Sequence, residues 1–208
     1  MNKNLLILGA KEFGCIAKEI AESMKCFEKI AVLDDESTDD IGKLNEYEAL
    51  VTEYSYAFVA IDEVDRRLGF IMKLQECGFA IISLISSKAY ISPSVQIMQG
   101  SLVEPMATIC AHSVISTGCR ISSGAVVKAS SMCCDGVHVD CNATVLGNTL
   151  VPAGFKVECG SVYTNEKIEI TDLFFDSEAW HKQLGKFNKT QQGPTPIDGR
   201  EYCFEDGM

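Results

Sequence analysis

Four side chains in the second half of the chain carry groups that could move or orient a proton. Arg120, His138 and Lys156 follow one another at eighteen-residue intervals, and Asp140 lies two residues after His138. An imidazole is the usual general base near neutral pH, and a neighbouring carboxylate can orient or charge it. Flanking cations would suit a base that works beside an anionic cofactor. These spacings matter only if residues eighteen positions apart lie side by side.

A six-residue repeat supplies that arrangement. Thirteen positions recur at this interval, and twelve of them are Ile or Val. They are Ile85, Ile91, Ile97, Val103, Ile109, Ile115, Ile121, Val127, Cys133, Val139, Val145, Val151 and Val157. A mostly small residue follows each by four positions, and the residue just before it is often glycine, at Gly100, Gly118, Gly124, Gly136, Gly154 and Gly160. Such a repeat predicts a left-handed parallel β-helix with three short strands per eighteen-residue coil.

The β-helix would stack Arg120, His138 and Lys156 in one outward column, with neighbouring strands about 4.8 Å apart. A second column, two residues along on the same face, would contain Ser122, Asp140 and Glu158. One interpretation is a catalytic site in which His138 is the base, Asp140 orients it, and Arg120 and Lys156 lie beside a cofactor. The other is a ladder of opposite charges that keeps the strands soluble and in register. The sequence leaves both open.

The first part of the chain alternates between the two periodicities. Apolar runs predict strands at residues 4–9, 29–36, 56–61 and 79–85, and helical spacing predicts helices at 15–24, 45–54 and 62–77. Strands that alternate with helices indicate a parallel, Rossmann-like sheet. Such sheets bind ligands beyond the carboxyl ends of their strands.

Three residues in this part are candidates for substrate binding. Gly9 and Gly14 are the outer glycines of a GxGxxG-like turn, but Lys11 and Glu12 stand between them, and the middle glycine is absent. Asp34 follows Gly14 by twenty residues at a strand end, where an acid can accept hydrogen bonds from ribose hydroxyls. A plain strand–turn–helix without a phosphate site explains the same residues equally well.

Composition narrows the classes of function. The chain has 208 residues, a formal net charge of −11 and ten cysteines. An acidic surface repels phosphate backbones and anionic lipids, so neither nucleic acid nor membrane insertion is expected. The cysteines form no CxxC pairs, so we expect small apolar fillers and no metal. The start of the chain does not read as a secretory signal, and we expect a cytoplasmic protein.

The segments LLILGA, AVLDDE, FVAID…RR and ISPSVQI, together with the repeat, resemble bacterial sugar O- and N-acetyltransferases of the hexapeptide-repeat type. The similarity covers about residues 3 to 161 and includes the sialic acid O-acetyltransferase-like and bacillosamine N-acetyltransferase-like proteins. It implies transfer from acetyl-CoA to the amine or hydroxyl of a nucleotide-linked sugar in surface-glycan synthesis. It also implies a homotrimer with active sites between neighbouring β-helices.

The resemblance breaks at the catalytic histidine. Ala129 occupies the position of the family's base, and Lys128 and Ser130 replace acids beside it. The family's second histidine is retained as His138, and Gly147 falls where a backbone amide binds the acyl carbonyl. Three hypotheses follow: a transferase with a relocated base, a transferase whose substrate or cofactor supplies the base, and a trimeric scaffold or ligand-binding protein that lost the base.

The expected organisation has three segments. Residues 1–84 form the Rossmann-like nucleotide- or sugar-binding domain, and residues 85–162 form the β-helix acyltransferase domain. Residues 163–208 form a C-terminal helix and an irregular, aromatic-rich extension. We expect this extension to cover the open end of the β-helix or a neighbouring subunit.

Overall fold

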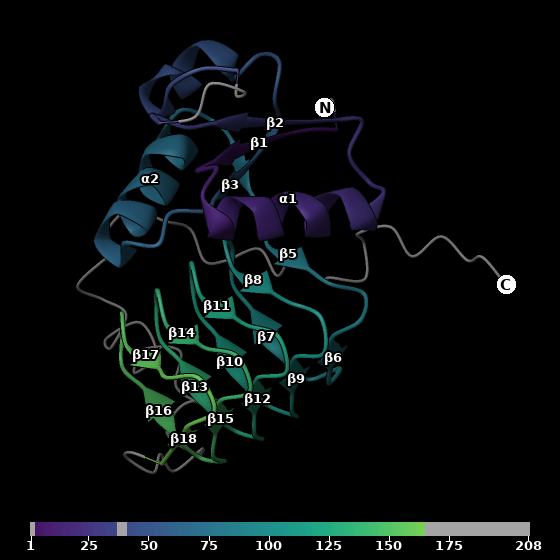
Figure 1. Ribbon diagram of the computed structural model, residues 1–208, viewed down its shortest axis with the longest axis vertical. Coiled ribbons are helices and arrows are strands. Elements are labelled where there is room, and N and C mark those ends of the chain that lie inside the picture. Colours follow the sequence, from purple (N-terminus) through teal and green to yellow (C-terminus); the bar gives the residue numbers. More distant parts are fainter. Residues whose placement is uncertain (1–2, 37–40, 165–208) are drawn as a thin grey trace, which may run out of the picture.

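The computed structural model describes residues 3–36 and 41–164. The predicted C-terminal helix and extension therefore lie, from residue 165 onward, outside the described residues. Figure 1 shows an α/β part above a stack of short strands, with α1 between the two. No helix in the described ranges is long and apolar enough to cross a bilayer.

The α/β part is built on a four-stranded sheet in the order β2-β1-β3-β4, and all neighbouring strands are parallel. Its elements are β1 (Asn4–Leu8), α1 (Glu12–Met24), β2 (Lys29–Leu33), η1 (Leu44–Leu50), β3 (Tyr56–Val59), α2 (Val64–Glu76) and β4 (Ala80–Ile81). This order agrees with the predicted alternation. The α-helix predicted over 45–54 is wrong, because the segment is a 3₁₀ helix. Its buried residues, Leu44 and Tyr47, are three apart, which suits a helix with three residues per turn.

The period-two alternation of β1 divides the apolar core between the faces of the sheet. Leu6 and Leu8 pack with α2 and η1 on one face. Leu5 and Ile7 pack with α1 on the other face, in a cluster that also contains Leu84 and Leu102 from the β-helix. The two parts of the molecule therefore share a continuous core on the α1 side.

The predicted strand over 79–85 is two strands that serve different sheets. β4 closes the α/β sheet, and β5 (Leu84–Ile85) begins the β-helix. Between them, the Ser83 hydroxyl donates to the Met98 carbonyl at 2.7 Å and accepts from the Ser101 amide at 3.0 Å. Two residues of turn are enough to pass the chain from one sheet to the other, so no linker separates the predicted first and second domains.

Within the described residues, the β-helix has fourteen two-residue strands, and the second residue of β5 to β17 is in each case a repeat position predicted above. The strands after β5 are β6 (Tyr90–Ile91), β7 (Gln96–Ile97), β8 (Leu102–Val103), β9 (Thr108–Ile109), β10 (Val114–Ile115), β11 (Arg120–Ile121), β12 (Val126–Val127), β13 (Met132–Cys133), β14 (His138–Val139), β15 (Thr144–Val145), β16 (Leu150–Val151), β17 (Lys156–Val157) and β18 (Val162–Tyr163). They form three parallel sheets: β5-β8-β11-β14-β17, β6-β9-β12-β15-β18 and β7-β10-β13-β16. The repeat residues fill the interior.

One corner of the β-helix is lined by glycine alone. The turns between β7/β8, β10/β11, β13/β14 and β16/β17 have positive φ at Gly100, Gly118, Gly136 and Gly154. The equivalent positions at the other two corners also hold Met106, His112, Ser130, Asn142 and Asn148. Positive φ alone therefore does not require glycine in this β-helix, and the glycine corner needs a second cause.

Helix α2 supplies that cause. A Cβ built on Gly136 would lie 2.3 Å from Val64 Cγ1, and one on Gly118 would lie 2.9 Å from Leu68 Cδ2. Val64 and Leu68 are one helical turn apart, so α2 lays an apolar stripe along the glycine corner. Any side chain at these turns would push the helix away.

Arg67 of α2 fixes this contact by hydrogen bonds. Its side chain is buried, and it donates to the carbonyl oxygens of Gly118 at 2.9 Å and Gly136 at 3.1 Å on two successive coils. The same guanidinium donates to the carbonyls of Ile61 at 2.6 Å and Asp62 at 2.9 Å after β3. Five donors in a rigid plane allow one arginine to join the two parts in this way.

An aromatic pair marks the last described coil. Phe155 occupies the repeat position of Cys119 and Val137, and Tyr163 occupies a position that is aliphatic in the earlier coils. The two ring centroids are 5.1 Å apart, and Tyr163 packs against the interior cluster.

We predict that Gly136→Ala destabilises the protein more than Gly160→Ala, by about 1–3 kcal/mol. Both glycines have positive φ, which costs a Cβ-bearing residue about 1–2 kcal/mol. Only the Cβ at Gly136 would also collide with Val64, and such overpacking costs about 1–3 kcal/mol. Urea unfolding of the two variants measures the difference. Adding Val64→Ala should reduce the penalty at Gly136, and equal penalties in all backgrounds would show that α2 does not rest on this corner.

Candidate functional site

The predicted column of side chains lies on the outward face of the sheet β5-β8-β11-β14-β17. Arg120 pairs with His138, and His138 pairs with Lys156, as the eighteen-residue spacing predicted. The same column begins with Leu84 and Leu102, which are buried against α1. The column changes from apolar to polar at Arg120, where the sheet emerges from beneath the α/β part.

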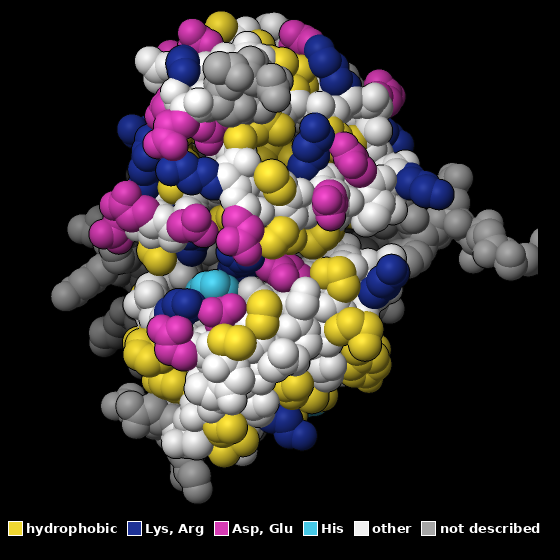
Figure 2. Space-filling model, in the orientation of Figure 1, with side chains coloured by type: hydrophobic (Ala, Val, Ile, Leu, Met, Phe, Trp, Pro, Cys, Tyr) yellow, Lys and Arg dark blue, Asp and Glu magenta, His cyan; other side chains and the backbone are white. Residues whose placement is uncertain are grey.

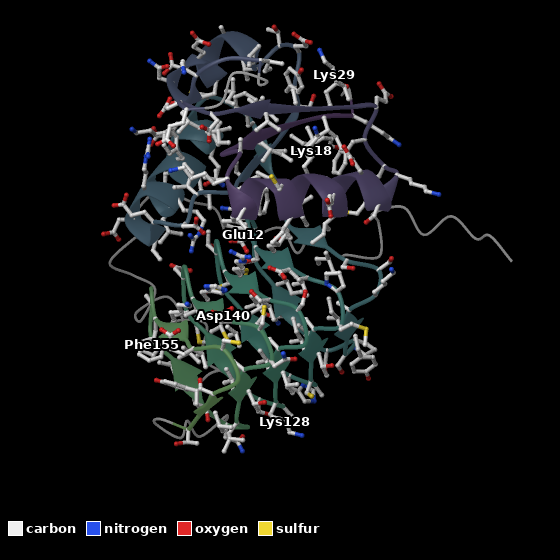
Figure 3. All side chains as sticks on the ribbon, in the orientation of Figure 1. Glu12, Lys18, Lys29, Lys128, Asp140 and Phe155 are labelled. Carbon is white, nitrogen blue, oxygen red and sulfur yellow. The ribbon has the colours of Figure 1, made fainter. Side chains whose placement is uncertain are left out.

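The surface between the two parts that carries Asp62, Arg120, His138, Asp140 and Lys156 is called the groove below. Arg120 stands at its inner end. Its Nη1 lies 3.7 Å from an Asp62 carboxylate oxygen just after β3, and its guanidinium lies 4.8 Å from the ring centroid of Phe13 in α1. Figure 3 shows Glu12, at the start of α1, above Asp140 on the β-helix. On the face drawn in Figure 2, acidic and basic side chains mix around a histidine in the hollow between the parts. The carboxyl edge of the α/β sheet thus faces the predicted residues, as expected of such sheets.

Glu104 engages Arg120 from within the β-helix. Its Oε1 accepts from Arg120 Nε at 3.0 Å, and its Oε2 accepts from the Ser123 amide and hydroxyl at 3.1 and 3.0 Å. The Glu104 side chain is 5% exposed and that of Arg120 13% exposed, so this ion pair is well shielded from water. Arg120 therefore has carboxylates on two sides, and its predicted role in cofactor binding would have to compete with them.

Lys156 is more accessible. Its Nζ lies 2.9 Å from Asp140 Oδ2 and 3.1 Å from Glu158 Oε2, and about half of the side chain is exposed. Hydrogen bonds to these carboxylates raise the pKa of Lys156. Burial works to raise the pKa of Asp140, but hydrogen bonds from Lys156 and the Cys141 amide outweigh it and hold that pKa below its ordinary value. Both groups are ionised at neutral pH.

His138 is held as a neutral imidazole. Burial, followed by the charge of Arg120, lowers its pKa to about 4. Its Nε2 is 2.9 Å from the Ser122 hydroxyl oxygen and 3.8 Å from Asp140 Oδ1. The longer distance exceeds a hydrogen bond, so Asp140 does not orient the ring as the predicted dyad requires.

Ala129 and Gly147 lie elsewhere on the β-helix. Both follow a strand of the second sheet and precede a strand of the third, so their corner is the one opposite the sheet that carries His138. They do stack as predicted, because the Asn148 amide donates to the Ala129 carbonyl at 3.1 Å. Figure 3 shows Lys128, next to Ala129, far from Asp140. Within one chain, Gly147 and His138 therefore lie on different sides of the β-helix.

The three N-terminal candidates have architectural contacts. A Cβ on Gly14 would lie 2.0 Å from the Gly9 carbonyl oxygen, and one on Gly9 would lie 2.3 Å from that of Ala60. Asp34 is buried, and its two carboxylate oxygens accept from the amides of Ala10 and Glu36, both at 2.8 Å. These contacts explain the residues as turn and packing elements, and their role in substrate binding stays a prediction.

The cysteines inside the β-helix act as small apolar residues. Cys119 and Cys133 are fully buried, and burial raises the pKa of the Cys119 thiol to about 12. Within residues 3–36 and 41–164, no group of three potential metal ligands comes together.

Sequence reasoning missed Glu104 as part of this site. It lies eighteen residues before Ser122, so it belongs to the column of Ser122, Asp140 and Glu158. Extending that column by one coil would have placed it beside Arg120. Phe13 and Asp62 gave no such signal, because their contacts depend on how the two parts pack.

No family model matches the chain. Among solved structures, it is similar to the acetyltransferase domain of PglB from Neisseria gonorrhoeae FA1090 in complex with acetyl coenzyme A. The identity is 27% and the TM-score 0.74, over 78% of this chain and 82% of that one. A histidine-to-alanine mutant of GDP-perosamine N-acetyl transferase from Caulobacter crescentus, in complex with CoA and GDP-perosamine, matches at 22% identity and a TM-score of 0.63, over 76% and 90%. PerB from the same organism matches at 23% and 0.58, over 77% and 91%.

The stacked sheets fit a left-handed β-helix. Of the structures named above, one is an acetyltransferase domain with acetyl coenzyme A and one is an N-acetyl transferase with CoA and GDP-perosamine. The two from Caulobacter crescentus are below 25% identity and support the fold alone. The similarity to the PglB domain is greater in both identity and TM-score, and it spans most of both chains.

We predict that His138 makes stability depend on pH. Its pKa is lowered from 6.5 to about 4 in the folded protein, so the unfolded chain binds a proton more readily between these values. The resulting stabilisation is complete above about pH 6.5 and is lost as the pH falls through about 4. In urea unfolding, the wild type should therefore lose stability relative to His138→Gln as the pH is lowered from 7 towards 4. His112→Gln, at an exposed turn, is the control, and a pH-independent difference for His138→Gln would contradict the prediction.

Proposed function

We propose that this protein is a cytoplasmic acetyltransferase that moves an acetyl group from acetyl-CoA to the amine or hydroxyl of a sugar. The supporting observation is the similarity to the acetyltransferase domain of PglB, which was solved with acetyl coenzyme A. We take the acceptor to be a nucleotide-linked sugar of surface-glycan synthesis, in line with the GDP-perosamine held by a more distant neighbour.

In this reaction the acceptor nitrogen or oxygen attacks the thioester carbonyl carbon, and its proton passes to a base. The tetrahedral intermediate then collapses, the carbon–sulfur bond breaks, and coenzyme A leaves as the thiol or thiolate. A backbone amide near the carbonyl oxygen stabilises the negative charge that develops there. We assign this role to the amide of Gly147.

A homotrimer would complete the site. Gly147 lies on the corner opposite the sheet that carries His138, so one chain cannot bring both to the same thioester. In our proposal the Gly147 corner of one copy meets the groove of its neighbour. His138 and Asp140 then line the acceptor site, and Lys156, which is half exposed, is the cation in this groove that coenzyme A phosphates can best reach.

We place the nucleotide part of the acceptor at the carboxyl edge of the α/β sheet. Gly9, Gly14 and Asp34 shape the turn at this edge, and Asp62 connects it to the groove through Arg120. The Rossmann-like part would thus hold the acceptor while the β-helix holds the donor.

The test of this function is transfer itself. The purified protein should bind acetyl-CoA in calorimetry and should acetylate members of a panel of free and nucleotide-linked amino sugars, with the product identified by mass spectrometry. A mass readout avoids thiol reagents, which would react with the ten cysteines. Lack of both acetyl-CoA binding and product would overturn the proposal.

A second candidate is a trimeric scaffold or ligand-binding protein that kept the fold and lost the base. It is favoured by Ala129, an exposed residue where the family has its histidine. We predict that Ala129→His changes turnover by less than about tenfold if the groove already performs the chemistry. A scaffold would show transfer only in Ala129→His, and a general base contributes about 10²–10⁴-fold. Ala129→Asn is the control for a polar side chain that cannot take the proton.

A further inference from the structure

The hydroxyl of Ser122 is buried behind His138. Ser122 follows β11, and none of its surface is exposed. Its backbone is committed to the coil, because its amide donates to the Val139 carbonyl at 2.9 Å and its own carbonyl accepts from the Ala125 amide at 3.1 Å. The side-chain oxygen lies 2.9 Å from His138 Nε2. A buried hydroxyl needs an acceptor for its proton, and this is the one hydrogen bond of the Ser122 side chain seen in the described part of the chain.

The direction of this hydrogen bond follows from the groups around it. Asp140 Oδ1 accepts from the Cys141 amide at 2.7 Å, and Oδ2 lies 2.9 Å from Lys156 Nζ. At 3.8 Å, Asp140 is too far from Nε2 to receive a proton from the ring. If Nε2 carried the proton, the Ser122 O–H would have no acceptor. The Ser122 hydroxyl therefore donates, and Nε2 accepts.

We propose that Ser122 fixes His138 in the tautomer with its proton on Nδ1, so that His138 donates a hydrogen bond to an uncharged oxygen of the ligand in the groove. Ser122 is then a positioning residue. The ligand half of this inference rests on the proposed function, and the tautomer does not. The acceptor's proton must leave by another group, because both ring nitrogens of His138 are already committed.

The charges around the ring support a neutral donor. Arg120 and Lys156 flank His138 in the column, and both disfavour an imidazolium. Glu104 and Asp140 act in the opposite direction but are themselves paired with these cations. The His138 side chain is 23% exposed, so a ligand in the groove can reach the ring.

The same three residue types form a different unit in serine hydrolases. There the carboxylate accepts from Nδ1–H, and the serine is accessible to substrate. Here the carboxylate lies nearest Nε2, and the serine has no exposed surface. Ser122 is therefore not a nucleophile, and we expect no acyl-serine intermediate.

Nuclear magnetic resonance tests the tautomer without any ligand. In ¹⁵N-labelled wild-type protein at neutral pH, His138 Nδ1 should show the shift of a protonated ring nitrogen, and Nε2 that of an unprotonated one. Ser122→Thr should keep this pattern, Ser122→Ala should lose it, and Ser123→Ala, which removes a hydroxyl bonded to Glu104, should leave it unchanged. A proton on Nε2 in the wild type overturns the inference, and this measurement needs no variant to fold.

Turnover tests the role of the donor. The side-chain amide of asparagine can donate from near the position of Nδ1 but cannot take a proton. If His138 donates, His138→Asn should keep turnover within about tenfold of wild type, whereas His138→Ala should lose substantially more. If His138 is the base, both variants should fall by about 10²–10⁴-fold. Wild-type protein without any transfer defeats the proposed function and leaves the tautomer result standing, so the two failures are distinguishable.

Discussion

The buried guanidinium of Arg67 is the interaction on which the arrangement of the molecule depends. It carries a charge into a site with almost no exposure, where burial lowers its pKa, and its hydrogen bonds end on four carbonyl oxygens. Two of these carbonyls belong to the α/β part and two to successive coils of the β-helix. A buried charge that lost these partners would be costly, so separating the two parts is opposed by more than lost apolar contact.

The contact of Arg67 and α2 with the β-helix determines how the two sides of the groove are placed. Because Arg67 and the glycine corner fix α2, the β3–α2 turn is held where Asp62 meets Arg120. On the other side of the groove, α1 ends the apolar part of the column and places Phe13 against Arg120. The polar residues of the groove are then largely paired with one another, from Glu104 to Glu158. Such pairing leaves little charge for an anionic ligand to neutralise, and it makes the uncharged groups, His138 among them, more important for recognition.

The sequence predicted the β-helix well, because a strict six-residue period has one simple structural solution and each strand is only two residues long. It predicted the stacking of Arg120, His138 and Lys156 for the same reason. It could not predict the Asp140–His138 distance, since side chains two residues apart on one strand face can turn toward different partners; here Asp140 turns toward Lys156. The contacts of Phe13, Asp62 and Arg67 could not be predicted either. They join the α/β part to the β-helix, and no local sequence pattern encodes how these two parts pack. The 3₁₀ segment at η1 was missed because its few buried positions fit two helical periods.

An aromatic pair distinguishes the last described coil of the β-helix from the earlier ones. The interior of each coil accepts aliphatic residues at one repeat position and mostly small ones at the other. Phe155 and Tyr163 place rings at one position of each kind; Tyr163 packs against the interior cluster, and Phe155 is 41% exposed. Whole eighteen-residue units could be gained or lost before this point without disturbing the register, so the distance between the α/β part and the far end of the β-helix is an adjustable quantity over evolutionary time.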